Sequence, residues 1–245
     1  MMKPRIAIPE PCSYDLEYSG RALPPYLQAV EAAGGEPVLI PLKSSPEEIA
    51  RSVASCAAIL LPGSKADVDP QKYNAEKHEK TAPADTLRDS ADELLLQDAY
   101  NLRKPVFGIC YGLQSLNVWR SGTLVQHIES PVNHSPGTKV ENAHQVMVAA
   151  DSLLGNKIVR GQAGNTVPVN SSHHQSADVV GDGLRAVARS AEDNVIEAIE
   201  GTTPGHYVLA VQWHPERSFQ QDPVSSNLFK TFIEAARLWS VVERA

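Results

Sequence analysis

Residues 105–112 (PVFGICYG) lead from an apolar strand into a helix. Gly108 and Gly112 permit a sharp strand-to-helix bend that a side chain would obstruct, and the bend presents Cys110 where chemistry can happen. The thiol also lies at the amino end of the expected helix, from Gly112 to Trp119, where free N–H groups and the helix dipole favour the thiolate. The stretch therefore predicts a sheet strand that ends at a reactive cysteine.

An unpaired cysteine is more often a small buried hydrophobe than a nucleophile. We leave Cys12 and Cys56 under that interpretation, because one follows a proline in a loop and the other precedes the apolar run Ala57–Leu61. Two glycines and a preceding strand are not needed merely to pack a cysteine. They favour a chemical role for Cys110.

Strands and helices alternate through the first half of the chain. Strands are expected at Arg5–Ile8, Pro37–Ile40 and Ala57–Leu61. Helices are expected over Ala22–Ala33, after the N-cap and capping-box sequence Ser45-Pro46-Glu47-Glu48, and over Thr86–Leu102. The apolar stripe of the last helix comprises Leu87, Ala91, Leu94, Leu95 and Leu102. Repeated units of this kind predict an α/β fold whose mostly parallel sheet is covered on both faces and binds ligands at the carboxyl ends of its strands.

After Trp119 the pattern changes to short strands and turns, which predicts an antiparallel extension of the sheet. The expected strands are Gln145–Ala149, Val167–Val169, Leu184–Ala188, Val195–Ile199 and Tyr207–Trp213. An amphipathic helix over Val224–Trp239 follows, with an inward face of Leu228, Phe229, Phe232, Ile233 and Ala236. The connection from Pro62 to about Asp85 is long, and loops of that length are more often active-site covers than spacers.

The composition argues against several classes of partner. The 245 residues suffice for one large domain, and no linker-like stretch divides them. A net charge of −7 without a Lys/Arg run argues against nucleic acid or an anionic membrane as partner. Three cysteines without CxxC spacing do not form a disulfide framework or a zinc module, and no apolar run suits a signal peptide or a membrane span. We expect a cytoplasmic protein that acts on a small molecule, and a homo-oligomer is compatible with this.

A nucleophilic thiol needs a base that is itself held in place, and His214-Pro215-Glu216 supplies both groups. Residues two apart in an extended segment point to the same face, and Pro215 discourages a helix at His214. Like Cys110, His214 follows a strand at its carboxyl end. Taken alone the tripeptide is equally typical of a surface turn, but together with the cysteine bend it favours a catalytic pair.

These segments together resemble the class I glutamine amidotransferase-like family, and within it the γ-glutamyl-γ-aminobutyrate hydrolase group of cysteine peptidases (peptidase C26). The likeness extends in order over nearly the whole chain. Its segments are Tyr26–Pro41 with Ala32-Ala33-Gly34-Gly35, Leu61–Ser64, Asp67–Pro70, Arg88-Asp89, Gly108–Gln114 with Asn117, Val169–Gln175 and Val211–Glu216. The resemblance implies a flavodoxin-like fold, a single domain over residues 1–245, and a triad of Cys110, His214 and Glu216.

The resemblance also implies a role for each matching residue. Cys110 would attack the γ-carbonyl of a γ-glutamyl amide and form a thioester, while His214 would protonate the leaving amine and then activate water. Glu216 would orient His214. The oxyanion hole would come from the backbone N–H groups of Tyr111, Gly63 and Ser64. The ends of the glutamyl group would be held by Gln114, Ser171 and Ser172, with His173 near the leaving group, and neither a metal nor an organic cofactor is expected.

Two other functions remain open at this point. The chain could be the glutaminase subunit of an amidotransferase that passes ammonia to a separate synthetase, or a binding protein that keeps the fold without turnover. Tyr111 stands where the hydrolase group often has arginine, and Arg120-Ser121-Gly122 replaces a more usual glycine pair. These departures concern the identity of the amine. Asp67, Asp69, His173 and His174 are metal-ligand types, but their spacing matches no metal motif, so we expect a capping or pocket-edge role for the Asp67–Pro70 loop.

Overall fold

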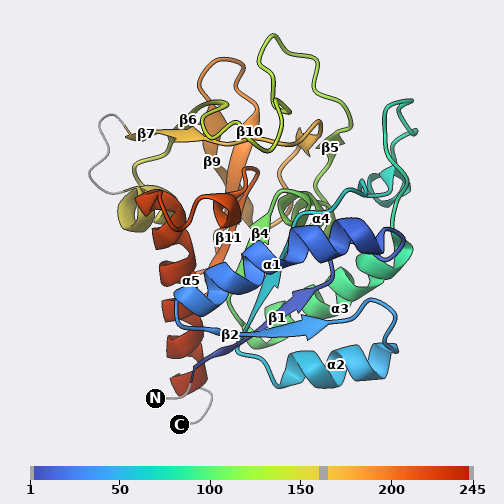
Figure 1. The fold of residues 1–245 in the computed structure, drawn as a ribbon, viewed down its shortest axis with the longest axis vertical. Coiled ribbons are helices and arrows are strands. Elements are labelled where there is room, and N and C mark those ends of the chain that lie inside the picture. Colours follow the sequence, from blue (N-terminus) through green and yellow to red (C-terminus); the bar gives the residue numbers. More distant parts are fainter. Residues whose placement is uncertain (1–2, 160–164, 243–245) are drawn as a thin grey trace.

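The computed structural model describes residues 3–159 and 165–242. The parallel strands are β1 (Arg5–Pro9), β2 (Glu36–Ile40), β3 (Ala58–Leu61), β4 (Val106–Ile109) and β11 (Val208–Val211). Antiparallel pairs continue the sheet through β10 (Ile196–Gly201), β9 (Leu184–Ser190), β6 (His144–Val148) and β7 (Thr166–Val169). Within the described residues these strands form one nine-stranded sheet in the order β2-β1-β3-β4-β11-β10-β9-β6-β7 (Figure 1). The predicted sheet with its antiparallel extension is confirmed.

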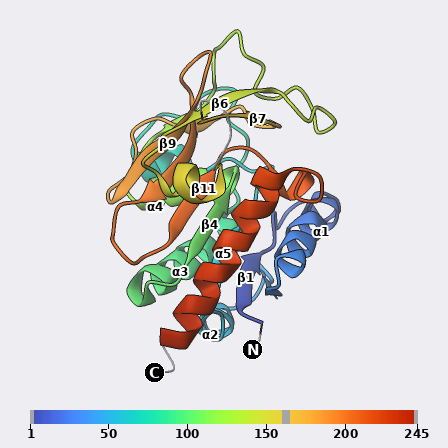
Figure 2. The ribbon, with the colours of Figure 1, turned by 90° about the vertical axis from the view of Figure 1, so that its left-hand side faces the viewer.

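Helices cover both faces of the parallel layer. Helices α1 (Leu16–Ala32) and α5 (Pro223–Val242) pack on one face, and α2 (Pro46–Ala54), α3 (Thr86–Leu102) and α4 (Tyr111–Trp119) pack on the other (Figure 2). Alternation along the strands explains the two cores, because neighbouring residues point to opposite faces. In β4, Phe107 contacts the rings of Phe229 and Phe232 from α5, whereas Val106 belongs to the core beneath α3.

The predicted helices form, with two corrections. Helix α1 begins at Leu16 rather than Ala22, because the carboxylate of Asp15 caps it by accepting the N–H of Tyr18. Helix α2 has the predicted capping box at Ser45. Helix α3 has the predicted bounds, but the predicted apolar stripe is wrong at both ends, since Leu87 and Leu102 are 42% and 44% exposed. The buried face of α3 instead includes Arg88, Asp89 and Asp92.

The remaining elements are short and lie mostly in connections. The long connection over residues 62–85 contains the 3-10 helix η1 (Pro70–Tyr73), which Asp69 caps by accepting the N–H of Gln71. The capping role expected for this loop is confirmed. Strands β5 (Leu124–Val125) and β8 (Ser176–Ala177) pair with each other, η2 (Leu154–Ile158) precedes β7, and η4 (Pro215–Arg217) follows β11. Of the helices in the described ranges, none has the length and apolar composition that a membrane crossing requires.

Candidate active site

Cys110 occupies the bend between β4 and α4. Its backbone has φ 53° and ψ −106°, a strained conformation for a residue with a side chain. The flanking glycines are required by packing as well as by the bend. A Cβ on Gly112 would overlap the carbonyl oxygen of Leu61, and one on Gly108 would lie 2.8 Å from the carbonyl oxygen of Gly112. The predicted tight strand-to-helix bend is confirmed, and the backbone fixes the direction of the thiol.

His214 and Glu216 form the predicted pair after β11. The Nδ1 atom of His214 lies 2.8 Å from Oε1 of Glu216, and both side chains are buried. Asn170 fixes the histidine backbone by accepting its N–H and donating to its carbonyl, each at 2.9 Å. Because the Glu216 carboxylate can only accept, Nδ1 holds the proton and Nε2 is left as the basic nitrogen. Nε2 of His214 has no hydrogen-bond partner among the described residues.

The sheet brings Cys110 and His214 to the same edge. Strands β4 and β11 are parallel neighbours, with Ile109 opposite Val211, so both strands end at one level. Gly63, after the adjacent strand β3, lies between the two side chains. A Cβ there would be 3.2 Å from Cε1 of His214 and 3.6 Å from Cβ of Cys110. Three segments far apart in the sequence thus meet around one point.

Burial decides the protonation of this pair. It raises the pKa of the Cys110 thiol to about 12, although the charge of Arg217 and the N–H of Tyr111 act in the opposite direction. Burial also lowers the pKa of His214 despite the nearby Glu216 carboxylate. The helix terminus at Cys110 therefore does not produce the thiolate that its position alone favours. The resting pair is a thiol beside a neutral imidazole.

The residues expected to form the oxyanion hole already make hydrogen bonds within the protein. The N–H of Gly63 donates to the hydroxyl of Tyr26 at 3.1 Å, and the hydroxyl of Ser64 accepts the N–H of Ala66. The Tyr111 side chain turns toward α3, where its hydroxyl donates to Asp89 at 2.6 Å. Its phenol is therefore a packing group, and its backbone N–H is the part that faces Cys110.

The residues expected to hold the glutamyl group make hydrogen bonds or ion pairs within the protein, and all except the partly buried Ser172 are buried. The amide of Gln114 donates to the carbonyl of Gln175 and to Oε1 of Gln212. The Ser171 hydroxyl donates to the carbonyl of His134, and the Ser172 hydroxyl accepts from Arg217 at 2.8 Å. The side chain of His173 turns to Glu197, with Nε2 and Oε1 3.5 Å apart.

Arg120 and His174, both noted in the sequence, have structural partners. Arg120 places its guanidinium over the rings of Tyr100 and Trp119, at the opposite end of α4 from Cys110. His174 pairs with Asp67 on the long connection, with 3.0 Å between Nε2 and Oδ2. His174 therefore fastens the 170–175 loop to that connection.

The sequence-based prediction gave no functional role to two arginines near the site, although Arg88 belongs to one segment of the resemblance. Arg88 is fully buried and donates to the carbonyls of Pro11 and Pro62 and to the carboxylate of Asp92. It therefore fixes the residue that precedes Gly63. An arginine on an amphipathic helix predicts a solvent-facing side chain, which is why no local pattern indicated its burial. Arg217 follows Glu216 directly, and this position next to the His214–Glu216 pair is the sequence signal that could have indicated it.

The peptidase C26 family matches residues 13–216, which include the bend, the Gly63 turn and the His214–Glu216 pair. The chain belongs to the peptidase C26 family. It is 34% identical over 223 residues to the γ-glutamyl-γ-aminobutyrate hydrolase of Escherichia coli strain K12, covering 86% of this chain and 85% of the relative. It is also 30% identical over 215 residues to protein NtpR of Enterococcus hirae, covering 85% and 87%.

Other members and neighbours extend this picture. A Mycobacterium tuberculosis protein, named as an unproven glutamine amidotransferase, is 37% identical over 213 residues, which cover 86% of this chain and 66% of that protein. The fold matches a Thermoplasma acidophilum protein provisionally assigned as one of the subunits of GMP synthase, with a TM-score of 0.68 and 13% identity over all of both chains. The fold is thus the flavodoxin-like α/β architecture expected, and family membership supports a hydrolase.

Proposed function

We propose that the protein hydrolyses γ-glutamyl amide bonds through a γ-glutamyl thioester on Cys110. The observation that supports this most is the meeting of Cys110, Gly63 and the His214–Glu216 pair at one edge of the sheet. A buried thiol, an oriented imidazole with a free nitrogen and a nearby backbone turn are the parts that acyl transfer needs. The hydrolase relatives indicate the γ-glutamyl class of substrate.

The reaction follows from the resting protonation of the pair. Nε2 of His214 accepts the Cys110 proton as sulfur attacks the γ-carbonyl carbon, because the thiol does not ionise by itself. The carbon–nitrogen bond then breaks, and the same proton goes to the leaving amine. Water next gives a proton to Nε2 and attacks the thioester, which releases glutamate and returns the proton to sulfur. Glu216 holds the tautomer of His214 throughout.

We assign the first oxyanion donor to the backbone N–H of Tyr111, which begins α4 directly after Cys110 and acts to lower the pKa of its thiol. We assign the second donor to the backbone N–H of Ser64, because the N–H of Gly63 donates to the Tyr26 hydroxyl; Tyr26 and Arg88 maintain the position of this turn. One such donor contributes about 3–4 kcal/mol to an acyl-transfer transition state. A donor in this turn would therefore accelerate the reaction substantially, which agrees with the close approach of Gly63 to Cys110 and His214.

A carboxylate of the substrate would meet Arg217. Its guanidinium donates to Ser172, and its charge is the strongest influence on Cys110 after burial. It also lines a cavity of about 580 Å³ together with Asn170 and Trp213. A planar guanidinium can hold a carboxylate through two hydrogen bonds. We propose that Arg217 anchors the substrate, while Gln114, Ser171 and His173 support the loop around it.

A panel of γ-glutamyl amides tests the proposal. Purified protein receives glutamine, γ-glutamyl-γ-aminobutyrate and γ-glutamyl polyamines, and glutamate release is followed by mass spectrometry. We expect turnover of one or more γ-glutamyl amines, and Cys110→Ala should reduce it to the background rate. Hydrolysis that survives Cys110→Ala would overturn the mechanism.

The named amidotransferase relatives support a second candidate, the glutaminase subunit. Turnover of glutamine alone, stimulated by an added synthetase, would move the function to that class. A covalent adduct with diazo-oxo-norleucine separates both enzymes from a binding protein of the same fold. Failure to form that adduct, together with no turnover of the panel, would favour the binding protein.

A further inference from the structure

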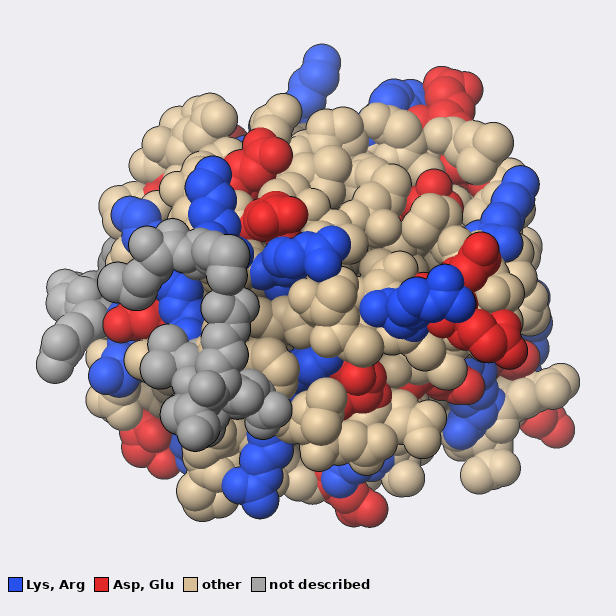
Figure 3. All heavy atoms as spheres, turned by 90° about the horizontal axis from the view of Figure 1, so that it is seen from below, with Lys and Arg blue, Asp and Glu red and all other residues tan. Residues whose placement is uncertain are grey.

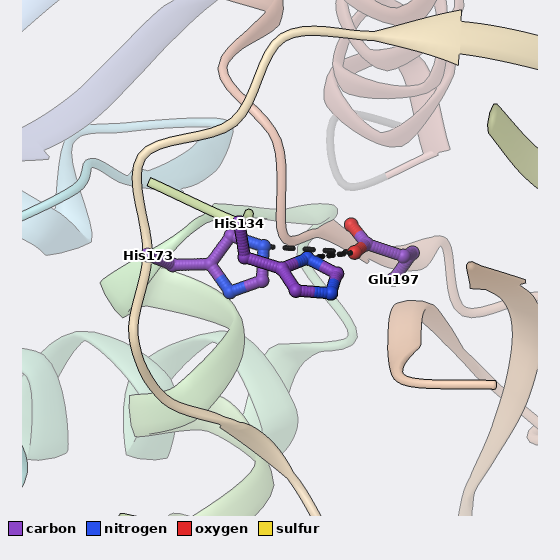
Figure 4. Close-up of side chains that lie close together, drawn as sticks. All are labelled: His134, His173 and Glu197. Atoms are coloured by element: carbon purple, nitrogen blue, oxygen red, sulfur yellow. Dashed lines mark ion pairs between the residues drawn. The ribbon is translucent and has the colours of Figure 1, made fainter. Parts of the chain in front are cut away.

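Two histidines and a glutamate from distant parts of the chain converge beneath the 170–175 loop. His134 lies in the connection between β5 and β6, His173 lies between β7 and β8, and Glu197 lies in β10 (Figure 4). One ligand atom from each lies within 4.8 Å of the others. Their residues are only 4%, 4% and 0% exposed. The proposed mechanism uses none of these three side chains for chemistry.

The hydrogen bonds of His173 determine which of its nitrogens is basic. Its Nδ1 lies 2.9 Å from the carbonyl oxygen of Gln175, and a carbonyl can only accept, so Nδ1 holds the proton. In the neutral ring, Nε2 then carries no proton and presents a lone pair. That lone pair faces Oε1 of Glu197 at 3.5 Å, and Nε2 has no hydrogen-bond partner among the described residues.

His134 has the same arrangement. Its Nε2 lies 2.8 Å from the carboxylate of Asp193, so Nε2 is the protonated nitrogen. Its Nδ1 faces Oε1 of Glu197 at 3.3 Å and forms no hydrogen bond with a described residue. Two buried imidazole nitrogens therefore point at one buried carboxylate, so positive charge must lie between them, either as protons on the rings or as a bound cation.

A metal ion accounts for this geometry. Ligand atoms at zinc bond lengths of 2.0–2.1 Å stand roughly 3.3–3.4 Å apart in a tetrahedron. The separations of 3.3 and 3.5 Å from Glu197 to the two imidazoles are close to that value, and the two imidazole nitrogens lie within 4.8 Å of each other. The pairing of His134 with Asp193 also matches the carboxylate–histidine arrangement that orients metal ligands.

A third histidine supports the carboxylate from outside. His144 lies with Nε2 2.9 Å from Oε1 of Glu197, a distance at which it donates a hydrogen bond. This contact would fix the orientation of Glu197 as an outer partner rather than as a ligand. We propose that Nδ1 of His134, Nε2 of His173 and the carboxylate of Glu197 bind one Zn²⁺, leaving a fourth position for water.

The site would join the active-site loop to the sheet. His173 shares its loop with Asn170, which fixes the backbone of His214. A zinc ion bound to both His173 and Glu197 would therefore hold that loop against β10. This is a structural role, and the proposal does not depend on which amine the enzyme releases.

Zinc binding by the full chain tests the site independently of activity. Protein stripped with a chelator is dialysed against zinc chloride, and bound metal is counted by elemental analysis and titration calorimetry. We expect one Zn²⁺ per chain, an increase in the melting temperature with zinc, and no such effect with magnesium chloride. X-ray absorption of the zinc-loaded chain should show two imidazoles and two oxygen ligands, one from Glu197 and one from water.

Substitutions assign the ligands. Glu197→Gln and His134→Asn should each weaken zinc affinity by more than His144→Asn, for which roughly 10–100-fold is expected of an outer partner. His127→Ala is the matched control, because His127 lies 3.5 Å from His174 outside the cluster and should leave affinity unchanged. Circular dichroism of each variant checks its fold. If a variant fails to fold, the X-ray absorption spectrum of the zinc-loaded native chain still identifies the ligands. Native protein that binds no zinc, or that binds it only at surface histidines, would overturn the proposal.

Discussion

Cys110 and His214 show how burial can reverse a local preference. A helix amino terminus stabilises a thiolate, but this stabilisation is smaller than the free energy needed to remove the negative charge from water. In the proposed mechanism the thiol therefore stays protonated until substrate arrives and His214 accepts its proton. The pair is poised for general-base catalysis rather than stored as an ion pair.

Alkylation of the free enzyme tests this protonation state. Iodoacetamide reacts with the thiolate, so the inactivation rate should keep rising from pH 8 to pH 10 because burial raises the pKa of Cys110 to about 12. Mass spectrometry of native and Cys110→Ala protein locates the adduct. In the same protein, kcat/KM should fall only below pH 6.5, because burial lowers the pKa of His214 and the base is lost when it binds a proton. An inactivation rate that levels off near pH 7 would instead indicate a preformed thiolate.

Position 63 requires glycine because a larger side chain would crowd Cys110 and His214, not because of its backbone conformation. A Cβ there would meet the hydroxyl of Tyr26 at 3.0 Å and the ring of His214 at 3.2 Å. We expect Gly63→Ala to lower kcat strongly and to change the urea unfolding midpoint little. Gly20→Ala is the control: nothing lies within 4 Å of its added Cβ, and it should stabilise α1 by about 1 kcal/mol. Equal activity of the two variants would contradict this role for Gly63.

At the scale of elements, α3 supports the candidate site through its buried polar side chains. Its Arg88 connects the helix to the ends of β1 and β3 through the carbonyls of Pro11 and Pro62, and its guanidinium lies 4.8 Å from the centre of the Tyr111 ring. The helix bounds were predictable from capping and periodicity. Its buried charged face was not, because burial of an arginine depends on partners that only the fold supplies.

Arg88→Met should destabilise the protein by about 3–5 kcal/mol, because it leaves Asp92 buried without its partner. Urea unfolding measures this loss. Arg88→Met with Asp92→Leu removes both charges and should recover much of the stability. Activity should not recover, since the carbonyl of Pro62 still lacks its donor and Gly63 loses its support. A double variant with native activity would show that Arg88 serves stability alone.

At the scale of the whole molecule, the parallel layer and the antiparallel extension contribute different parts. The layer places Gly63, Cys110 and His214 at the ends of β3, β4 and β11, while the extension and its loops hold Asn170 and the histidine cluster. Lysine, arginine and acidic side chains are interspersed over the lower face (Figure 3). This mixed charge agrees with the expectation of a small-molecule substrate, while the oligomeric state stays a prediction.

By itself the sequence determined the order of strands and helices, the bend at Cys110 and the His214–Glu216 pair, because turns, caps and two-residue spacing act between near neighbours. Only the tertiary structure decided that the thiol stays protonated, that the Tyr111 phenol turns away from Cys110, and that His134, His173 and Glu197 meet. The sequence led us to expect no metal because Asp67, Asp69, His173 and His174 match no metal motif, and His134 and Glu197 lie far from His173 along the chain. Burial and long-range convergence are properties of the packed sheet, which no local pattern encodes.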